Sequence, residues 1–371
     1  MPDHHWDPDR LDDQAHLAAG DPGGMLPAVA SSAAQIRVAH RAAVAAGLGA
    51  LARYGRPRAL VVVGMGGAGI AGDLLAAVCG QGAPLPIVTV RDYRLPGWVG
   101  AADLVVAVSS SGRSEETLAA AAEAVRRGCH LLAVAAADSP LHAVAAQAGA
   151  PFVPVHVDAP SRATMWGLTV PLLVLAGELG LVRAGEEVFE GTAKRLEDIA
   201  HRCRPSSESF INPGKMLALD LAETVPMIWG SSPLTAVVAH RLADQLHKNA
   251  KYPAIWGQIP EATHNQVVAF DGPLATRDLF AEDAGRSLRL FVLRDTEEHP
   301  QVARRREASV RVAEERDVRV TELVAEGEGP LERVAGLIAH ADYASVYLAL
   351  GYGIDPGPVP PVTELKARIT Q

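Results

Sequence analysis

Hydroxyls, glycines and isolated charged side chains gather in a few short stretches of this sequence. The first stretch is GMGGAG at residues 64–69, which follows the apolar run at 59–63. It fits G-x-G-x-x-G, and Asp92 follows the next apolar run, as in a dinucleotide-binding turn. The alternative is a tight strand-to-helix turn that needs glycines for its backbone alone.

The second stretch, SSSGRSEET at residues 109–117, also follows an apolar run and precedes a helical pattern. Hydroxyls beside the N–H groups of a helix N-terminus suit a phosphate group. The alternative is simple helix capping by Ser111 or Ser114. The hydroxyls of Ser109, Ser110, Ser111 and Ser114 exceed what a cap requires, so we predict a phosphate site. A dinucleotide fold places its pyrophosphate at the first turn, so this second loop weakens the dinucleotide interpretation.

Two single charged residues have open interpretations. Arg162, in DAPSRATMWG, precedes an apolar helical pattern, and it is either a surface charge or a clamp for an anionic group. His264, in PEATHNQ, is either an ordinary loop histidine or a proton shuttle, because histidine titrates nearest to neutral pH.

No metal site is predicted. His240 and His247 are two helical turns apart, whereas a helical metal pair needs a spacing of three or four and a third ligand. The cysteines, Cys79, Cys129 and Cys203, also lack metal spacing, and we expect them to be reduced.

The composition narrows the class of protein. The chain has 371 residues, 49% of them apolar, and a formal net charge of −9, which argues against a general nucleic-acid binder. The N-terminus, MPDHHWDPDR, lacks the basic and apolar regions of a signal peptide. The apolar run at 168–179 is too short to cross a bilayer. We therefore expect a cytoplasmic protein without a membrane partner.

Strand and helix patterns alternate along the chain, which predicts an α/β fold with parallel sheets covered on both faces. A cluster of Pro, Ser and Asn at 204–214 is the expected linker between two halves. The expected strands are residues 59–63, 86–90, 104–108, 130–134 and 152–155, then 226–229, 267–269, 288–293, 319–323 and 344–350.

Taken together and in order, the motifs resemble a known family. GMGGAGIAGD, RDYRLP, SSSGRSEETL, PSR, NPGKMLA, QLHKNAKYPA, PEATHNQ and DPGPV…LK are similar to the bifunctional phosphoglucose/phosphomannose isomerases of the sugar isomerase (SIS) superfamily. The resemblance implies two tandem SIS domains, each a parallel sheet flanked by helices. The implied division is an N-terminal extension at 1–34, SIS domain 1 at 35–203 and SIS domain 2 at 204–371.

The resemblance also implies an activity, the aldose–ketose isomerisation of a 6-phosphosugar through a cis-enediol, without a metal or a nucleotide. It implies a homodimer in which the motif histidine comes from the neighbouring subunit. In this sequence, the implied phosphate-binding residues are Gly66, Gly67, Ser109, Ser111 and Ser114. The implied catalytic residues are His264 for ring opening, Arg162 for the enediolate and Lys366 near the substrate.

Three positions depart from the family pattern. Ala68 stands where the family usually has a serine that contacts phosphate, which removes one donor worth about 1 kcal/mol. Gly357 stands where the family often has a threonine associated with accepting both epimers. Lys248 stands where the family has its catalytic glutamate.

The departure at Lys248 bears on the reaction itself. A carboxylate accepts a proton at neutral pH, whereas a lysine near its ordinary pKa is protonated and does not. Burial would have to lower that pKa by several units for Lys248 to act as the base. Replacement bases in the sequence are His247, Glu261, Glu223 or His264 in a double role. Two functions stay open: a phosphosugar isomerase, or a non-catalytic phosphosugar-binding sensor that lost its base.

Overall fold

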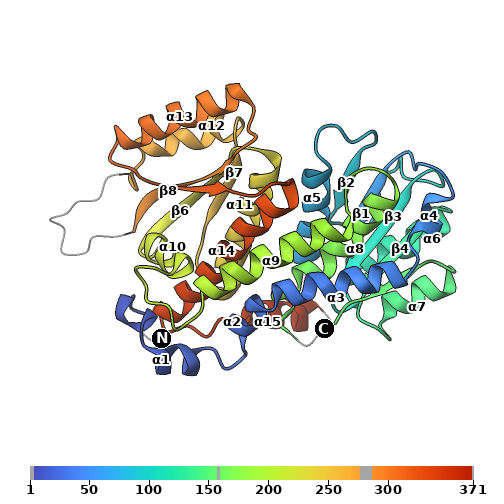
Figure 1. The fold of residues 1–371 in the computed structure, drawn as a ribbon, viewed down its shortest axis with the longest axis horizontal. Coiled ribbons are helices and arrows are strands. Elements are labelled where there is room, and N and C mark those ends of the chain that lie inside the picture. The colour runs from blue at the N-terminus through green and yellow to red at the C-terminus, as the bar shows by residue number, and fades with distance from the viewer. Residues whose placement is uncertain (1–3, 157–158, 276–285, 370–371) are drawn as a thin grey trace. The chain divides into compact units, whose positions relative to one another are not determined.

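Two compact α/β units make up the protein, as the computed structural model shows for residues 4–156, 159–275 and 286–369 (Figure 1). The sheet A unit comprises Ala30–Asp198 and Glu326–Gly336. The sheet B unit comprises Met1–Val29, Ile199–Ala325 and Leu337–Gln371. The predicted fold class, parallel sheets flanked by helices, is confirmed in both units.

Sheet A is a parallel sheet with the strand order β2-β1-β3-β4-β5. Its inner strands consist mainly of valine, leucine and alanine and are almost entirely buried, as expected when helices cover both faces. The strands are β1 (Leu60–Val63), β2 (Ile87–Val90), β3 (Leu104–Ser109), β4 (His130–Ala135) and β5 (Phe152–Pro154).

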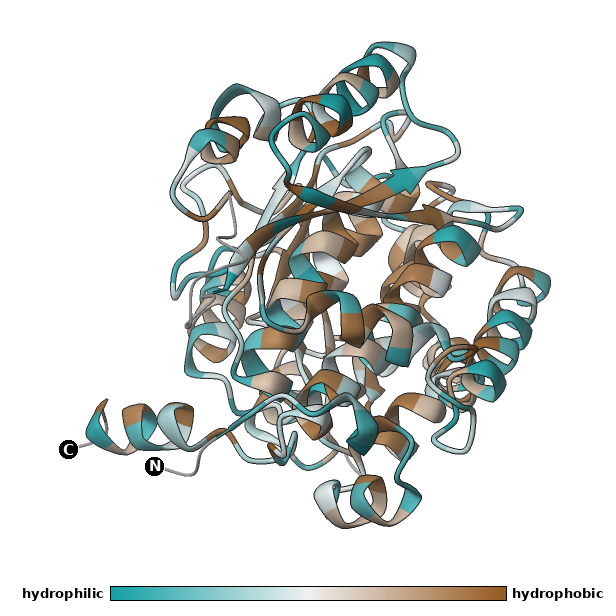
Figure 2. Ribbon diagram, turned by 90° about the vertical axis from the view of Figure 1, so that its left-hand side faces the viewer, coloured by the Kyte–Doolittle hydropathy of each residue, from teal (hydrophilic) through white to brown (hydrophobic). Residues whose placement is uncertain are grey.

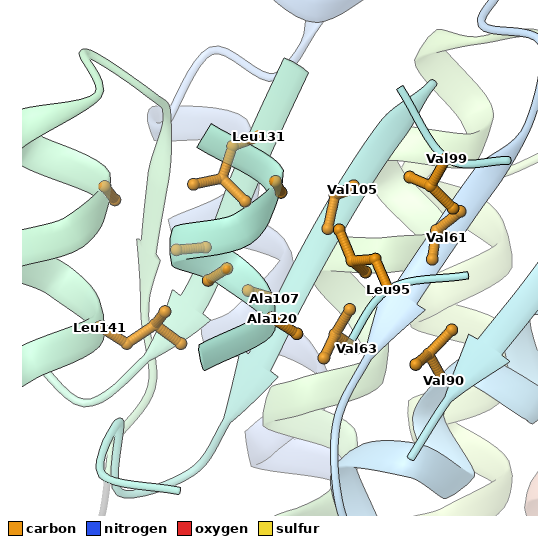
Figure 3. Packing of buried hydrophobic residues seen from close by; sticks show 14 of the residues in the cluster. Val61, Val63, Val90, Leu95, Val99, Val105, Ala107, Ala120, Leu131 and Leu141 are labelled. Carbon is orange, nitrogen blue, oxygen red and sulfur yellow. The ribbon is translucent and has the colours of Figure 1, made fainter. Parts of the chain in front are cut away.

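Helices cover sheet A on both sides. On one side, Ala120 of α6 (Glu115–Arg126) and Leu141 of α7 (Pro140–Gln147) pack against strand residues such as Val61, Val105 and Leu131 (Figure 3). The remaining helices of the unit are α3 (Ser32–Ala45), α4 (Gly49–Ala52), α5 (Gly67–Cys79), η2 (Ser161–Ala163), α8 (Met165–Glu178) and most of α9 (Glu186–Arg202). Figure 2 shows hydrophobic residues gathered along the strands and hydrophilic residues on the outer faces of helices.

Sheet B is also parallel, with the order β7-β6-β8-β9. Its strands are β6 (Thr224–Gly230), β7 (Ile255–Gln258), β8 (Ser287–Asp295) and β9 (Arg319–Ala325). Its helices include α10 (Pro213–Leu221), α11 (Pro233–Gln245), η3 (Leu246–Ala250), α12 (Ala262–Asn265), η4 (Gln266–Asp271), α13 (Pro300–Glu314), α14 (Pro330–Gly351) and α15 (Pro360–Ile369). The order of these four strands repeats the order of the first four strands of sheet A.

The N-terminal segment packs within the sheet B unit. It forms η1 (Pro8–Leu11), α1 (Gln14–Gly20) and α2 (Met25–Ala30), and Leu11, Leu17 and Met25 are almost fully buried. The expected linker at 204–214 is packed as well, because the buried Lys215 ammonium donates to the carbonyls of Pro205 (2.8 Å) and Ser207 (2.6 Å). The boundaries predicted at 34 and 203 stay a prediction.

Two expected strands are wrong. Residues 267–269 belong to the 3-10 helix η4, and residues 344–350 lie inside α14. The edge strand that completes sheet B is β7, which precedes η4 and was not expected. Within the described residues, α14 is the one helix long and apolar enough to cross a bilayer, but 94% of its most apolar window is buried in the protein. That burial is the behaviour of a core helix.

Candidate active site

Two of the sequence motifs flank the switch point of sheet A. The chain passes from β1 to β2 in one direction and then returns past β1 to β3, so the connections diverge between β1 and β3. Ligands of open α/β sheets bind at this switch point, outside the carboxyl ends of the strands. The glycine turn follows β1 and the serine loop follows β3, and each leads into a helix of at least three turns.

The glycine turn presents backbone rather than side chains. Gly66 precedes α5 with φ 54° and ψ −124°, a conformation that only glycine adopts readily, and Gly67 begins the helix. Ala68, which the sequence analysis singled out as a departure, is 6% exposed. Its methyl group lies over Gly64, where an added Cβ would be only 2.9 Å away. The turn therefore offers N–H groups at a helix N-terminus without a hydroxyl at 68.

The hydroxyls of the serine loop make local hydrogen bonds. Ser109 is buried at the end of β3, and Ser111 is exposed, with its Oγ accepting the Arg113 N–H at 3.3 Å. Ser114 occupies the N-cap position of α6 but makes no side-chain cap hydrogen bond, and its hydroxyl donates to Glu116 at 2.8 Å. Ser114 thus holds the N-cap position that the capping alternative gave it, but its hydroxyl does not satisfy the first N–H groups of α6.

Arg162 lies in the segment that packs beside the serine loop. It is half-buried in η2, which follows the carboxyl end of β5. The Thr164 Oγ1 lies 3.4 Å from the Ser110 Oγ, and the Gln35 side chain donates to the Ala163 carbonyl at 2.8 Å. The sheet A unit thus places the glycine turn, the serine loop and the Arg162 segment at the same edge of one sheet.

Lys248 lies on a wide turn at the end of α11. The helix continues into η3, a π-helical turn, and π turns of this kind are frequent at functional sites. Lys248 is half-buried, while the neighbouring Asn249 is fully buried and donates to the Ser345 Oγ at 2.9 Å. The turn is close to the amino end of β6, because the Tyr252 hydroxyl exchanges hydrogen bonds with the Thr224 backbone (2.9 and 2.6 Å).

His264 lies on the other face of sheet B and toward its other end. Its helix α12 follows β7, and Ala262 packs in one cluster with Met227 and Trp229 of β6. The opposite face carries α11, whose His240 ring stacks on Trp256 of β7 at 4.4 Å. Figure 1 shows α12 and α13 on one side of these strands and α11 on the other. β6 has seven residues, so its two ends are about 20 Å apart.

The structure therefore does not bring Lys248 and His264 together within one sheet B unit. Lys366 is exposed on α15, which follows the turn that contains Gly357. No three His, Cys, Asp or Glu side chains gather as metal ligands within the described ranges.

The alternative bases differ in their surroundings. The His247 Nε2 accepts the Ala254 N–H at 3.3 Å, so the proton of a neutral His247 is on Nδ1 and its accepting lone pair is engaged. The Glu261 carboxylate accepts from Asn265 at 2.8 Å on the α12 side of the sheet. Glu223 directly precedes β6 in a left-handed conformation (φ 55°).

Sheet B has a second switch point, between β6 and β8, which was missed in the sequence. There Ser232 caps α11 and donates to the buried Asp295 carboxylate at 2.7 Å, while the Ser231 Oγ accepts the Asp295 N–H at 2.8 Å. The Asp295 carboxylate thus lies at the switch point of sheet B, whereas the switch point of sheet A presents hydrogen-bond donors. The signal was GSSPLT after a strand, which is the counterpart of the glycine turn.

Comparisons with known proteins agree with the fold and with the family that the sequence resembles. Residues 210–369 match the family described as the bacterial phospho-glucose isomerase C-terminal SIS domain. A bifunctional phosphoglucose/phosphomannose isomerase from Caldicellulosiruptor bescii is 32% identical over 312 residues, 84% of this chain and 89% of the relative. Its counterpart from Aquifex aeolicus is 29% identical over 84% of this chain and 90% of the relative. The solved structure of a hypothetical protein from Thermus thermophilus has the same fold, with a TM-score of 0.73 and 16% identity over 98% of this chain and 93% of that one.

Proposed function

The chain belongs to the bifunctional phosphoglucose/phosphomannose isomerase family, and on that premise we propose that it interconverts hexose 6-phosphates, glucose 6-phosphate or mannose 6-phosphate with fructose 6-phosphate. The observation that carries the proposal is the pair of donor loops at the switch point of sheet A. Both present N–H groups at a helix N-terminus, and the serine loop adds hydroxyls. A phosphate dianion is the ligand that such a pair suits best.

Residues of the sheet A unit bind the phosphate and stabilise the enediolate. Gly66, Gly67, Ser109, Ser111 and Ser114 hold the phosphate. Arg162, in the segment beside the serine loop, stabilises the negative charge of the enediolate, as a guanidinium does without changing its own protonation.

The proton chemistry requires three further residues. His264 opens the sugar ring by moving a proton between the ring oxygen and the C1 hydroxyl. A base then takes the C2 proton of the aldose while O1 gains a proton, which gives a cis-enediol. The base returns its proton to C1 while O2 loses a proton, which gives the ketose. Lys248 occupies the position of this base, and Lys366 approaches the substrate. The reaction moves protons only, so we propose no metal and no nucleotide cofactor.

We propose a homodimer with a shared site, and the separation of two proposed catalytic residues in sheet B supports this proposal. Lys248 and His264 lie on opposite faces of the sheet, so one sugar phosphate reaches both only if one of them comes from another copy. We propose that His264 of the partner subunit completes each site. We also propose a cytoplasmic location, in keeping with the buried α14 and with a small sugar phosphate, rather than nucleic acid or membrane, as the partner.

Mixing two inactive variants tests the shared site. Co-refolded Arg162→Ala and His264→Ala chains should regain about one quarter of the wild-type rate, because half of the randomly assorted dimers carry one intact site of two. If both residues served a site within one chain, the mixture would stay as inactive as either variant.

A coupled assay at high enzyme concentration tests the proposed activity. We expect slow turnover of fructose 6-phosphate by the wild-type protein and a kcat about 10²-fold higher or more for Lys248→Glu, because a positioned base contributes roughly 10²–10⁴ in rate. Lys194→Glu, on the exposed surface of α9, is the matched control and should leave kcat unchanged. A wild-type protein that neither binds nor turns over hexose 6-phosphates contradicts the proposal.

The lysine at position 248 also favours a second candidate, a non-catalytic phosphosugar sensor. In that case fructose 6-phosphate binds to the wild-type protein, and binding weakens in the Ser111→Ala, Ser114→Ala double variant, but no turnover is measurable. If the wild-type protein turns over fructose 6-phosphate and Arg162→Ala does not, the non-catalytic sensor is excluded.

A further inference from the structure

The ammonium group of Lys251 joins two segments that lie far apart in the sequence. Its Nζ donates to the carbonyls of Lys248 (3.0 Å) and Asn249 (3.1 Å), in the turn that ends η3. It also donates to the carbonyl of Asp355 (3.1 Å), more than a hundred residues later. An ammonium has three protons, so it can serve all three of these acceptors at once.

The backbone of Lys251 is adapted to this role. The residue is the C-cap of η3 and adopts a left-handed conformation, with φ 55° and ψ 34°. Left-handed geometry is uncommon for a residue with a side chain. Here it ends the helix and returns the ammonium to the last carbonyls, where a positive charge is favourable.

The second segment is the turn at 355–357. The Asp355 carboxylate accepts the Gly357 N–H at 2.7 Å, which closes the turn before α15 and Lys366. Lys251 thus joins the turn that carries Lys248 to the turn from which the Lys366 helix starts.

Buried polar contacts hold α11 and η3 against α14. Arg241 and Gln245 both donate to the Asp342 carboxylate of α14, at 2.7–3.0 Å, and Asn249 donates to Ser345 one turn later. These donors recur every four residues, so one face of α11 and η3 is held on α14. The contact of η3 with residues 355–357 is the hydrogen bond that Lys251 donates to the Asp355 carbonyl.

We propose that Lys251 is a positioning residue, which holds the 248–251 turn and the 355–357 turn in one arrangement and so directs Lys248 and the Lys366 helix toward the same substrate. The catalytic part of this proposal rests on the proposed isomerase function. The physical tie between the two turns does not.

Hydrogen–deuterium exchange combined with kinetics tests the proposal. Lys251→Met keeps the length of the side chain and removes its donors, whereas Lys251→Arg keeps the charge. Lys194→Met is the matched control on an exposed helix. In Lys251→Met, peptides that cover 246–252 and 353–359 should both exchange at least 10-fold faster. The kcat for fructose 6-phosphate should fall 10-fold or more while KM changes less than 3-fold, and Lys251→Arg should restore part of both effects.

The possible outcomes separate the two proposals. Unchanged exchange at 353–359 in Lys251→Met overturns the tie, whatever the kinetics. Faster exchange in both segments with an unchanged kcat overturns the positioning role. A wild-type protein without turnover contradicts the proposed function, while the exchange data still decide the tie. If Lys251→Met does not fold, Lys251→Gln, with two donors in place of three, takes its place in the same comparison.

Discussion

Replacing Gly112 by alanine should lower the stability of the protein by more than the strain of a left-handed backbone alone explains. Gly112 has φ 62°, and a Cβ at this position would overlap the Cβ and Oγ of Ser139 and lie 3.2 Å from the Cβ of Ala135. Ser139 is itself anchored, because it is the N-cap of α7 and its Oγ accepts the His142 N–H at 3.3 Å. The loop therefore has no free volume for a methyl group.

The magnitude follows from two separable costs. A left-handed alanine costs about 1–2 kcal/mol of stability, and overpacking a closed site adds about 1–3 kcal/mol. Gly149 is the matched control, since it has the same φ of 62° but no atom within 4 Å of an added Cβ. We expect Gly149→Ala to cost about 1–2 kcal/mol and Gly112→Ala about 2–5 kcal/mol. Only Gly112→Ala should weaken binding of fructose 6-phosphate.

Thermal unfolding of the two variants and calorimetric titration with fructose 6-phosphate provide the measurements. One kcal/mol shifts the melting temperature of a unit of this size by about 2–4 °C. The double variant Gly112→Ala, Ser139→Gly removes the overlapping atoms and should recover most of the difference, because glycine is a tolerable N-cap. Equal melting temperatures for Gly112→Ala and Gly149→Ala would refute the reasoning.

Three further predictions concern other parts of the chain. Ala68→Ser should strengthen binding of fructose 6-phosphate about fivefold, the equivalent of one neutral hydrogen bond, and an unchanged Kd would show that position 68 does not face the phosphate. Arg241→Met leaves the buried Asp342 carboxylate without its guanidinium and should cost about 3–5 kcal/mol in denaturant unfolding, whereas the double variant with Asp342→Leu should cost less. Burial raises the pKa of Cys79 and of Cys203 to about 11, so both thiols are protonated at pH 8; they should react slowly with a disulfide reagent until the pH approaches 11 or the chain unfolds, and rapid labelling at pH 8 would contradict this.

The local units of the fold were readable in the sequence because each lies in a continuous segment. Apolar runs became strands, and the turns after β1 and β3 began helices as expected. The errors arose where neighbours outside the segment decide the structure. Residues 344–350 are apolar throughout, and such a run fits a buried strand or a buried helix equally well. β7 has only four residues, and its place at the edge of sheet B depends on its pairing with β6.

The sequence by itself determined the residue types: the serines and glycines of the two loops, Arg162 beside them, and the lysine at position 248. The tertiary structure decided which of these lie close together within one unit. In the sequence, Lys248 and His264 are separated by one short strand and look like neighbours. In sheet B, however, the chain moves outward from β6 to β7 and back past it to β8. Because crossovers between parallel strands are right-handed, this reversal puts α11 and α12 on opposite faces of the sheet. The handedness of the crossovers therefore separates the two residues within one chain.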